Sequence, residues 1–471
     1  MRIPFLLLLA LGCSAAAPPE AAAPLTGAPP AANVDPKHAE LARQLEATAL
    51  AALADRDAPV PGFAVRVVSH GDVLLSHGYG LADLPRQKEV REDSIFRVGS
   101  LTKQFTAAAV LQLEEQGKLK LDDPLTLYLK DYPPPAKPVT LRHLLTHTSG
   151  IPGYTELQWF PSHMNQATPH EELVATFAKE PLQFDPGSRF SYSNSGYFLL
   201  GLVIERVSGQ SYAEYLREHV LPGALHDTRY CPDAQDYERA ALGYHSVAGK
   251  LEPAAPLSMT LPYSAGGLCS TVGDLVSWSR ALASGKVVSA ATFERMAAET
   301  SLSSGAKSPY GFGLFRDDLV GHARISHGGG INGFSSHLAY YPADDLFVAV
   351  LVNTETSMAA GLSEQLARVV LGVPEPELKD LALTEAEAKP VLGTYAIREL
   401  GQTILIAWDG SSLRLGPAQH PDKGARMLSQ GGGEYVVKEL KARVSFELEG
   451  GVAKILVVHQ MGHEFRGERL P

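Results

Sequence analysis

The sequence predicts an α/β protein: an antiparallel sheet flanked by helices, with an inserted helical lobe, followed by a small all-β C-terminal barrel. Strand patterns appear at residues 61–83 and return from residue 325. Helical periodicity dominates the region between these two blocks. After residue 390 only short strand patterns occur, separated by glycine turns. Pairing of the two strand blocks would leave the middle helices as a separate lobe, and a concave site is expected between two lobes.

The first strand block has clear helix and hairpin signals around it. Apolar residues at helical spacing predict a surface helix over residues 37–55, and residues 61–83 form a hairpin pattern around a His70-Gly71-Asp72 turn. A short apolar strand, 95–98, then ends at Gly99, where a helix ending before Gly117 begins. Further helical patterns are expected at 196–207, 212–220, 270–284 and 358–371, and residues 141–154 are expected to form a helical turn that leads into a Ser-Gly loop. Returning strands are expected from 325, at 336–341 and at 346–353.

The last part of the chain reads as a separate domain. We expect a large α/β domain over residues 39–373, a linker over 374–390 that starts with prolines and continues as an acidic, Ala-rich stretch, and the barrel over 391–471. Asp409-Gly410 and Gly450-Gly451 are turn signals between strands. Seven strand patterns are present, at 391–398, 403–408, 412–415, 434–438, 443–449, 452–458 and 464–467. Their spacing is typical of an antiparallel barrel or sandwich of about 80 residues.

The composition and charge of the chain limit the kinds of partner that it can bind. The chain has 471 residues, of which 45% are apolar and 20% charged, as in ordinary globular proteins. Its formal net charge is −11 and it has no run of basic residues. This charge balance argues against nucleic acid and anionic membrane surfaces as partners, whereas the oligomeric state stays open.

The N-terminus resembles an export signal. A positive start, Met1-Arg2, precedes an apolar run that is too short to span a bilayer, which predicts a signal segment over 1–17 and an Ala/Pro-rich tether over 18–38. Cleavage could follow Ala15-Ala16-Ala17. Alternatively, Ala10-Leu11-Gly12-Cys13 resembles a lipoprotein box with Cys13 acylated. We expect a periplasmic or cell-envelope location, with membrane contact only through such an anchor.

The remaining cysteines, Cys231 and Cys269, leave two alternatives open. In an exported protein they could form a disulfide, or they could be two separate buried thiols. No Cys-x-x-Cys occurs, which excludes a zinc ribbon. His143 and His147 are four apart, but Leu144 stands where a metalloprotease needs glutamate, so a buried or capping role is favoured. We expect no metal or organic cofactor.

Ser100-Leu101-Thr102-Lys103 lies where the strand-to-helix pattern begins. Residues three apart on a helix are neighbours, so the Lys103 amine can reach the Ser100 hydroxyl. A desolvated lysine loses basicity and can accept a serine proton, and the Ser100 amide lies where helical N–H groups lack partners. A Ser-x-x-Lys spacing is weak evidence alone, since a capping serine beside a solvated lysine is commoner. A second match, Ser304 to Lys307, has no helix pattern after it and is taken as chance.

Tyr192-Ser193-Asn194 is the second candidate motif, in a serine-rich loop before a helix. A tyrosine beside a lysine can act as general base, and an Asn amide can orient a substrate carbonyl or the lysine. Alone, the motif is more often an Asn cap beside a packed Tyr.

His327-Gly328-Gly329-Gly330 is the third motif, among the returning strands. Its glycines let a substrate backbone lie against the strand edge, and the Gly330 amide could complete an oxyanion hole with that of Ser100. The simpler interpretation is a glycine-rich turn with a surface histidine. The same four letters occur in some α/β-hydrolases, but these require a Gly-x-Ser-x-Gly elbow that the chain lacks.

In this order the three motifs resemble those of the class C β-lactamase-like serine hydrolases, a group with penicillin-binding DD-peptidases, D-aminopeptidases and esterases. The flanking segments IFRVGSLTKQFTA, LRHLLTHTSGIPGY, FSYSNSGYFLLGLVIERVSG, SAGGLCSTVGDLVSWSRAL, YGFGL and HGGGINGFSS carry the likeness over about Glu40 to Leu371. The resemblance implies a β-lactamase/transpeptidase-like fold with the active site between sheet and helical lobe. The tail is similar to lipocalin-like barrels appended to some members. His327 stands where class C β-lactamases have Lys, which argues against efficient β-lactam turnover.

The expected function is hydrolysis of amide or ester bonds through an acyl-enzyme on Ser100, most simply of a D-amino-acid-containing peptide or a small ester. Lys103 and Tyr192 would share proton transfer, while Asn194 and the Gly328–Gly330 backbone would bind substrate. His327 would protonate the leaving group or bind a carboxylate, and would give the rate a pH dependence near pH 6 to 7, about the ordinary histidine value. The alternatives are a β-lactamase or penicillin-binding protein, or a catalytically silent binding protein of the same fold.

Overall fold

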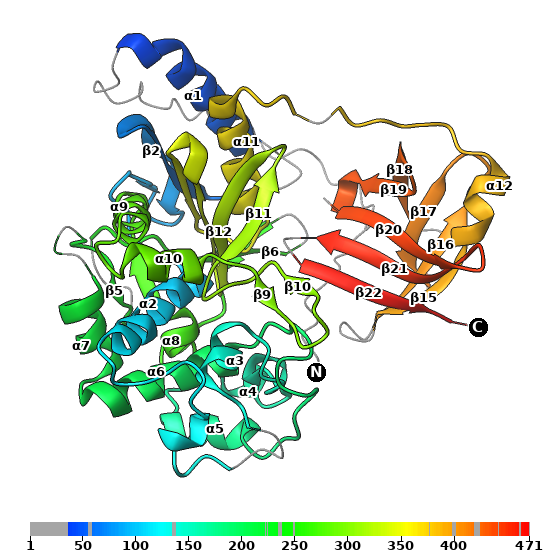
Figure 1. Cartoon of the computed structure of the whole chain (residues 1–471). Helices are drawn as coiled ribbons and strands as arrows, with labels where there is room; N and C mark the ends of the chain where they lie inside the picture. The colour runs from blue at the N-terminus through cyan, green and yellow to red at the C-terminus, as the bar shows by residue number, and fades with distance from the viewer. Residues whose placement is uncertain are drawn as a thin grey trace. The chain divides into compact units, whose positions relative to one another are not determined.

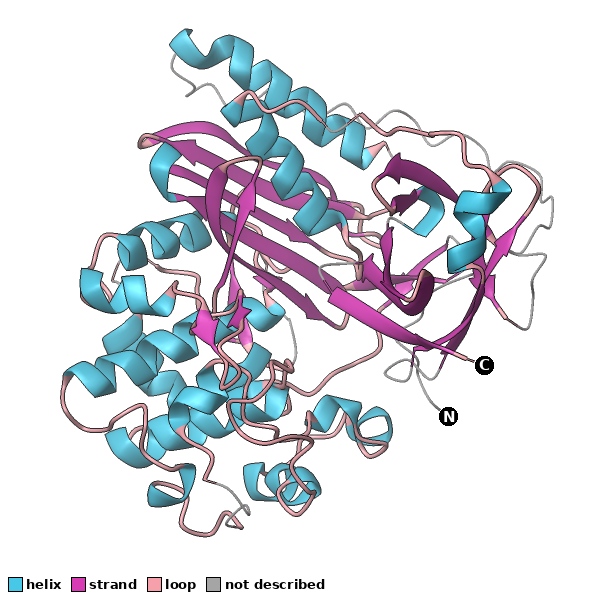
Figure 2. Ribbon diagram, turned by 45° about the vertical axis from the view of Figure 1, so that its right-hand side comes forward, coloured by secondary structure: helices cyan, strands magenta, loops and turns pink. Residues whose placement is uncertain are grey.

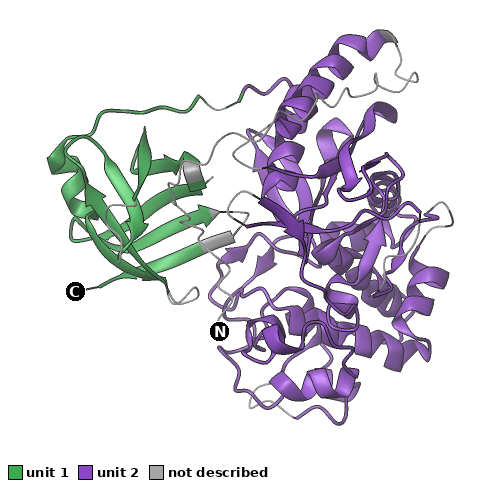
Figure 3. Ribbon diagram, turned by 180° about the vertical axis from the view of Figure 1, so that it is seen from behind, with its two compact units in different colours: residues 1–24, 375–471 green, residues 25–374 purple. Residues whose placement is uncertain are grey.

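The computed structural model describes residues 36–471, apart from gaps at 55–58, 134–137, 222, 224, 234–237, 248–249, 376, 398–401, 419–423, 441, 461–462 and 471. The chain divides into two compact units that meet in the sequence between Pro374 and Glu375 (Figure 3). The larger unit holds a mixed α/β structure and the smaller one a β-barrel. The expected signal segment, Cys13 and the tether up to residue 35 lie outside the described residues.

A seven-stranded antiparallel sheet forms the centre of the larger unit (Figure 1). In spatial order its strands are β11 (Phe315–Leu319), β12 (His322–Ile331), β13 (Phe334–Tyr341), β14 (Leu346–Val352), β1 (Gly62–Ser69), β2 (Asp72–Asp83) and β3 (Lys88–Glu89). Strands β1 and β14 pair antiparallel, with Val65 opposite Val350. The predicted pairing of the first and last strand blocks is therefore confirmed.

Helices cover both faces of this sheet because its central strands are apolar on both sides. Val65 of β1 packs with Leu45 of α1 (Ala39–Leu53) and Leu366 of α11 (Met358–Leu371). The neighbouring residue, Ala64, lies in the opposite cluster with Trp278 of α9 (Val272–Ala283). Successive strand residues point to opposite faces, so β1 joins two cores. Figure 2 shows the paired α1 and α11 on one side of the sheet.

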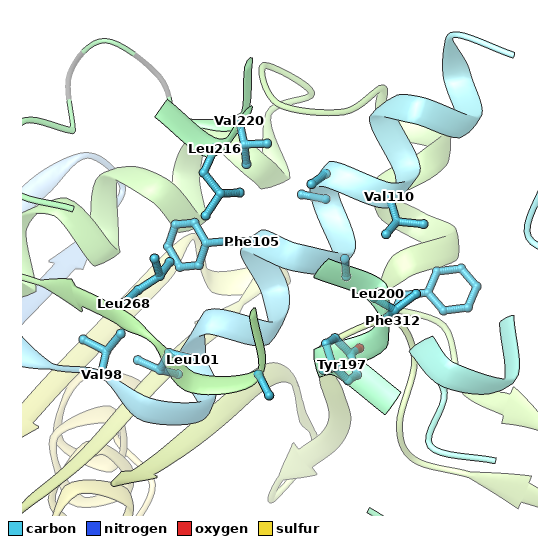
Figure 4. Close-up of a cluster of buried hydrophobic side chains, with 14 of the residues drawn as sticks. Val98, Leu101, Phe105, Val110, Tyr197, Leu200, Leu216, Val220, Leu268 and Phe312 are labelled. Atoms are coloured by element: carbon cyan, nitrogen blue, oxygen red, sulfur yellow. The ribbon is translucent and has the colours of Figure 1, made fainter. Parts of the chain in front are cut away.

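The helical lobe is inserted between the strand blocks, as predicted. Its helices are α2 (Thr102–Glu115), α3 (Leu141–Leu145), α4 (Phe160–His163), α5 (His170–Phe177), α6 (Asn194–Ser208), α7 (Tyr212–Tyr215), α8 (Tyr263–Gly266) and α10 (Ala290–Met296). Helix α2 is buried on almost every side, and its Phe105 ring stacks on that of Trp278 with 4.0 Å between the ring centroids. Figure 4 shows Phe105 among other buried side chains, including Leu216 and Leu268. Helix α2 is therefore a central helix of the lobe, and it buries even Thr102, Lys103 and Gln104.

Several short strands lie outside the seven-stranded sheet, and the sequence analysis predicted only the first of them, as the short strand over 95–98. Strands β4 (Phe96–Arg97), β8 (Leu268–Ser270) and β5 (Arg229–Tyr230) form a small sheet just before Ser100. Cys269 of β8 is bonded to Cys231 in a disulfide, with the two Cα atoms 5.3 Å apart. The bridged alternative is therefore the one in the structure. Two further hairpins are β6 (Tyr244–Val247) with β7 (Lys250–Pro253), and β9 (Thr300–Ser301) with β10 (Lys307–Ser308).

The smaller unit is a closed eight-stranded barrel rather than a sandwich. Its strands are β15 (Gly393–Ile397), β16 (Gln402–Trp408), β17 (Leu413–Pro417), β18 (Ala425–Gly431), β19 (Glu434–Val437), β20 (Ala442–Glu449), β21 (Val452–Gln460) and β22 (His463–Arg469), preceded by α12 (Glu385–Ala388). Tyr395 of β15 pairs with Arg469 of β22, which closes the barrel. The sequence analysis missed β18, whose inward residues Ala425, Met427 and Ser429 are neither β-branched nor aromatic, the residue types enriched in strands. Among all the described residues, no helix is both long enough and apolar enough to traverse a bilayer.

Candidate active site

Ser100 lies in a 3₁₀ turn, η2 (Gly99–Leu101), that leads directly into α2. Lys103 is the second residue of α2, so the helix spacing brings its Nζ 3.0 Å from the Ser100 Oγ. The same Nζ is 2.8 Å from the Asn194 Oδ1 and 2.8 Å from the Ala265 carbonyl oxygen. The amine therefore has three close neighbours, of which only the Ser100 hydroxyl can also donate a proton.

The Lys103 side chain is completely buried, whereas Ser100 keeps partial contact with solvent. Burial lowers the pKa of Lys103 well below its usual range, because removing an ammonium from water disfavours the charged form. No carboxylate acts on this amine to restore its charge: its described hydrogen-bond partners are a hydroxyl, an amide and a carbonyl. The environment thus favours a neutral amine beside the serine.

Asn194 begins α6, and its amide spans the site. Its Oδ1 accepts from Lys103, and its Nδ2 donates to the Thr155 Oγ1 at 3.2 Å. The Tyr192 ring lies under the lysine, with Nζ 4.7 Å from the ring centroid. Burial raises the pKa of Tyr192, and a hydrogen bond with the Ser100 hydroxyl acts in the opposite direction. Tyr192 is accordingly a protonated phenol at neutral pH rather than a ready-made phenolate base.

The glycine triplet occupies the second half of β12, beside the serine turn, and is not a turn itself. A Cβ on Gly329 would lie 2.1 Å from the Val98 carbonyl oxygen, and one on Gly99 would lie 2.8 Å from the Gly330 oxygen. Only glycines allow the two backbones to approach this closely, and Gly99 also has a φ of +51°. A Cβ on Gly330 would meet open space, so this backbone faces an accessible volume next to Ser100.

His327 lies in β12 with both ring nitrogens engaged. Nδ1 is 2.5 Å from the Gly328 carbonyl oxygen, which can only accept, so Nδ1 carries the hydrogen. The bare Nε2 then accepts from the Tyr310 hydroxyl at 3.0 Å. Burial and the nearby Lys103 lower the pKa of His327 to about 3. The expected titration near pH 6 to 7 is therefore wrong, because the low-dielectric surroundings keep this imidazole neutral.

The second Ser-x-x-Lys match, His143 and His147 behave as the sequence suggests. Lys307 donates to Ser301 instead of Ser304, and both members of the second Ser-x-x-Lys match are exposed. His143 caps α3 by accepting from the Thr140 amide, while His147 is buried. Within the described ranges, no cluster of three or more His, Cys, Asp or Glu side chains is arranged to hold a metal ion.

A beta-lactamase family model matches residues 41–371, most of the chain. The chain belongs to the beta-lactamase family. This beta-lactamase family member is 28% identical to penicillin-binding protein 4* of Bacillus subtilis (strain 168) over 420 residues, covering 84% of this chain and 92% of the relative. It is 29% identical to a D-aminopeptidase of Gluconobacter oxydans (strain 621H) over 368 residues, covering 76% of this chain and 67% of that protein.

Solved structures agree with this assignment. An octameric penicillin-binding protein homologue from Pyrococcus abyssi superposes with a TM-score of 0.66 at 26% identity, covering 90% of this chain and 99% of that one. A D-stereospecific amidohydrolase from Streptomyces sp. gives a TM-score of 0.60 at 28% identity, with 72% and 100% coverage. This beta-lactamase family protein is a serine hydrolase of the peptidase and esterase type.

Two contributors to the site, the Ala265 carbonyl and Tyr310, were not singled out from the sequence, and a third, His147, was assigned only a buried or capping role. The Ala265 carbonyl acts through the backbone and leaves no side-chain signal. Tyr310 and His147 occur inside YGFGL and LRHLLTHTSGIPGY, segments that carry the family resemblance. Both are buried beside Tyr192, with ring centroids 6.2 Å and 4.1 Å away respectively. Their placement depends on contacts between segments far apart in the chain.

Proposed function

We propose that this hydrolase cleaves an amide bond next to a D-amino acid, or a small ester, through an acyl-enzyme on Ser100. The observation that carries the proposal is the set of three contacts made by Lys103. A neutral amine has two N–H donors and one lone pair. Because Asn194 Oδ1 and the Ala265 carbonyl can only accept, they take the two donors, and the lone pair is left for the Ser100 hydroxyl.

In the proposed acylation step, Lys103 Nζ accepts the Ser100 proton while the serine oxygen attacks the substrate carbonyl carbon. The carbonyl oxygen becomes an oxyanion, and the backbone amides of Ser100 and Gly330 donate to it. The close approach of Gly99 to Gly330 supports this pairing of amides. Asn194 holds Lys103 and orients the substrate carbonyl.

The intermediate then collapses when the carbon–nitrogen or carbon–oxygen bond of the leaving group breaks. The protonated Lys103 returns its proton through the Tyr192 hydroxyl to the leaving group, so no net charge accumulates. Water next attacks the acyl carbon while Lys103 accepts one of its protons. The bond between this carbon and the Ser100 Oγ then breaks, and Lys103 returns the proton to Oγ, which regenerates both residues. In this scheme His327 stays neutral and helps to shape the leaving-group side, with Gly328 and Gly329 as the backbone against which the substrate lies.

Amide substrates with D-stereochemistry are favoured by the relatives' names, a D-aminopeptidase and a D-stereospecific amidohydrolase. The alternative, β-lactam turnover or penicillin binding, has support from the relative named penicillin-binding protein 4*. The neutral state of His327 weighs against it, because a substrate carboxylate on that side would meet no cation at this position.

A test begins with a fluorophosphonate and a fluorescent penicillin, each incubated with the full chain, followed by peptide mapping. Purified protein is then offered D- and L-amino-acid amides, short esters and nitrocefin. We expect label on Ser100 and faster hydrolysis of a D-amide than of its L-enantiomer and of nitrocefin. Faster nitrocefin turnover would establish the β-lactamase alternative, and absence of any label would establish a silent binding protein.

Two alanine variants act as matched controls, since each removes one hydroxyl from a Ser-x-x-Lys pair. Ser100→Ala should abolish labelling and hydrolysis with little loss of stability, because this hydroxyl is partly exposed. Ser304→Ala lies in an exposed turn and should change neither. Loss of labelling in Ser304→Ala instead would contradict the choice of nucleophile.

Export to the periplasm or cell envelope is a second part of the proposal. It is supported by the apolar run after Met1-Arg2 and by the Cys231–Cys269 disulfide, a bond that persists in oxidising compartments. Growth with radiolabelled palmitate followed by cell fractionation tests both the location of the protein and the acylation of Cys13. Label lost in Cys13→Ala would support acylation of Cys13, whereas unlabelled envelope protein would support simple signal cleavage, and cytoplasmic protein would contradict export.

A further inference from the structure

We propose that His147 is a positioning residue for the reaction, which holds the Tyr192-Ser193-Asn194 segment against Lys103 through a neutral imidazole. The inference rests on the proposed function, because it concerns how the groups around Ser100 are kept in reacting geometry. His147 itself contacts neither Ser100 nor a substrate in this scheme.

His147 binds the chain on both sides of Tyr192. Its carbonyl oxygen accepts from the Ser191 amide at 2.8 Å, and its ring Nδ1 accepts from the Ser193 amide at 3.0 Å. The imidazole also packs on the Tyr192 ring, with 4.1 Å between ring centroids and 32° between ring planes. Two backbone amides and one ring are thus fixed by a single residue.

These contacts require one protonation state. An amide N–H can only donate, so Nδ1 must be bare and the ring hydrogen must be on Nε2. The buried Nε2 has no hydrogen-bond partner among the residues that the structure describes. His147 also has a φ of +55°, which few residues other than glycine adopt. An orphan donor and a left-handed backbone together are unfavourable for folding alone, and such features gather at functional sites.

Tyr192 in turn shields Lys103, whose Nζ is 4.7 Å from the centroid of its ring. The titratable groups that face His147 are Lys103 of α2, Tyr192, Tyr197 of α6, Tyr310 and His327 of β12. If Tyr192 loosens, water reaches Lys103 and favours its charged form. The pH profile of acylation therefore reports on His147 through Lys103.

Two variants separate the two roles of the His147 side chain, which are packing on the Tyr192 ring and accepting a hydrogen bond from the Ser193 amide. His147→Phe keeps a flat ring against Tyr192 but cannot accept from Ser193. His147→Asn loses most of the ring but offers Oδ1 near the Nδ1 position and tolerates positive φ. We expect His147→Phe to lower the fluorophosphonate labelling rate about 10²-fold, as for a small displacement of reacting groups. The acidic limb of the pH–rate profile, where the rate falls as Lys103 becomes protonated, should shift to higher pH. His147→Asn should recover most of the rate and the original limb.

His143→Asn is the matched control, because this histidine lies in the same segment but only caps α3. His143→Asn should lower the melting temperature without shifting the acidic limb of the pH–rate profile. If His147→Phe is folded and labels at the unaltered chain's rate, or outperforms His147→Asn, the inference is overturned. If the unaltered chain itself is never labelled, the proposed function fails instead, so the two failures are distinguishable.

A measurement on the unaltered chain avoids any folding problem in the variants. Nitrogen-15 NMR of labelled histidines, with the His147 signal assigned by its loss in His147→Asn, should show the Nε2–H tautomer, unchanged down to pH 5. A signal that titrates near pH 6 to 7, or one of the Nδ1–H tautomer, would overturn the inference, because neither form can accept from Ser193.

Discussion

The Tyr310 hydroxyl donates a hydrogen bond to the His327 Nε2 at 3.0 Å, and this bond ties Tyr310 to strand β12, which carries the glycine triplet. Since Nδ1 of the same ring donates to the Gly328 carbonyl, the imidazole is fixed in one tautomer and one orientation. Both side chains are buried, so the pair behaves as a fixed wall of the site.

Tyr310→Phe removes one hydroxyl and leaves the aromatic packing in place. Losing this hydrogen bond should cost about 1 kcal/mol, and the freed imidazole should lower kcat/KM for a D-amino-acid amide by about 5- to 10-fold. Steady-state kinetics and thermal unfolding of the variant measure the two effects. A neighbouring ring substitution, Phe315→Leu, controls for packing, and an unchanged kcat/KM in Tyr310→Phe would show that the orientation of His327 is irrelevant.

The pH profile tests the neutral state of His327. Because its pKa is lowered to about 3, its protonation should cause no inflection in kcat/KM near the ordinary histidine value of about 6.5. Activity should instead fall when acid protonates Lys103. Comparison of the native profile with that of His327→Ala decides the matter: an inflection near pH 6.5 that disappears in the variant would mean that His327 titrates during catalysis.

Buried neutral histidines should also make the fold acid-sensitive. Burial and the nearby Arg324 and His327 lower the pKa of His337 from 6.5 to about 3. Between these values the unfolded chain binds a proton that the folded chain does not, so the unfolding free energy falls as the pH falls, by about 1.4 kcal/mol per pH unit for this group. Urea unfolding from pH 7 to about pH 4 should show a shallower dependence for His337→Leu. Equal slopes for that variant and for the exposed-site control His226→Leu would contradict the assignment.

The disulfide should contribute measurably to stability. Cys231 and Cys269 close a loop with a sequence separation of 38, for which chain entropy predicts about 4 kcal/mol. Mass analysis of non-reduced peptides should find the two cysteines linked, and the double variant Cys231→Ser, Cys269→Ser should melt at a lower temperature. Two free thiols after alkylation of the native protein would disprove the bond.

Sequence alone was sufficient for the coarse organisation. The strand blocks, the middle helices and the separate barrel follow from periodicities of two and 3.6 residues, which are local properties. Helix α11 was predicted to the residue, as Met358–Leu371. Ser100 and Lys103 were paired correctly because three residues on a helix fix their separation, which is 3.0 Å between Oγ and Nζ. Strand β18 was missed because its inward side chains carry no strong strand signal.

Only the tertiary structure decided the states of the groups in the site. Lys103 meets the Ala265 carbonyl across 162 residues of sequence, and Tyr310 reaches His327 from another loop. The sequence pattern suggested a titrating histidine at 327, whereas burial makes it neutral. The protonation state of each group depends on how much water it loses on folding and on which hydrogen-bonding groups surround it. Many segments that are far apart in the sequence contribute to both. A local motif can name the reacting residues, but the charge that each one holds is a property of the folded site.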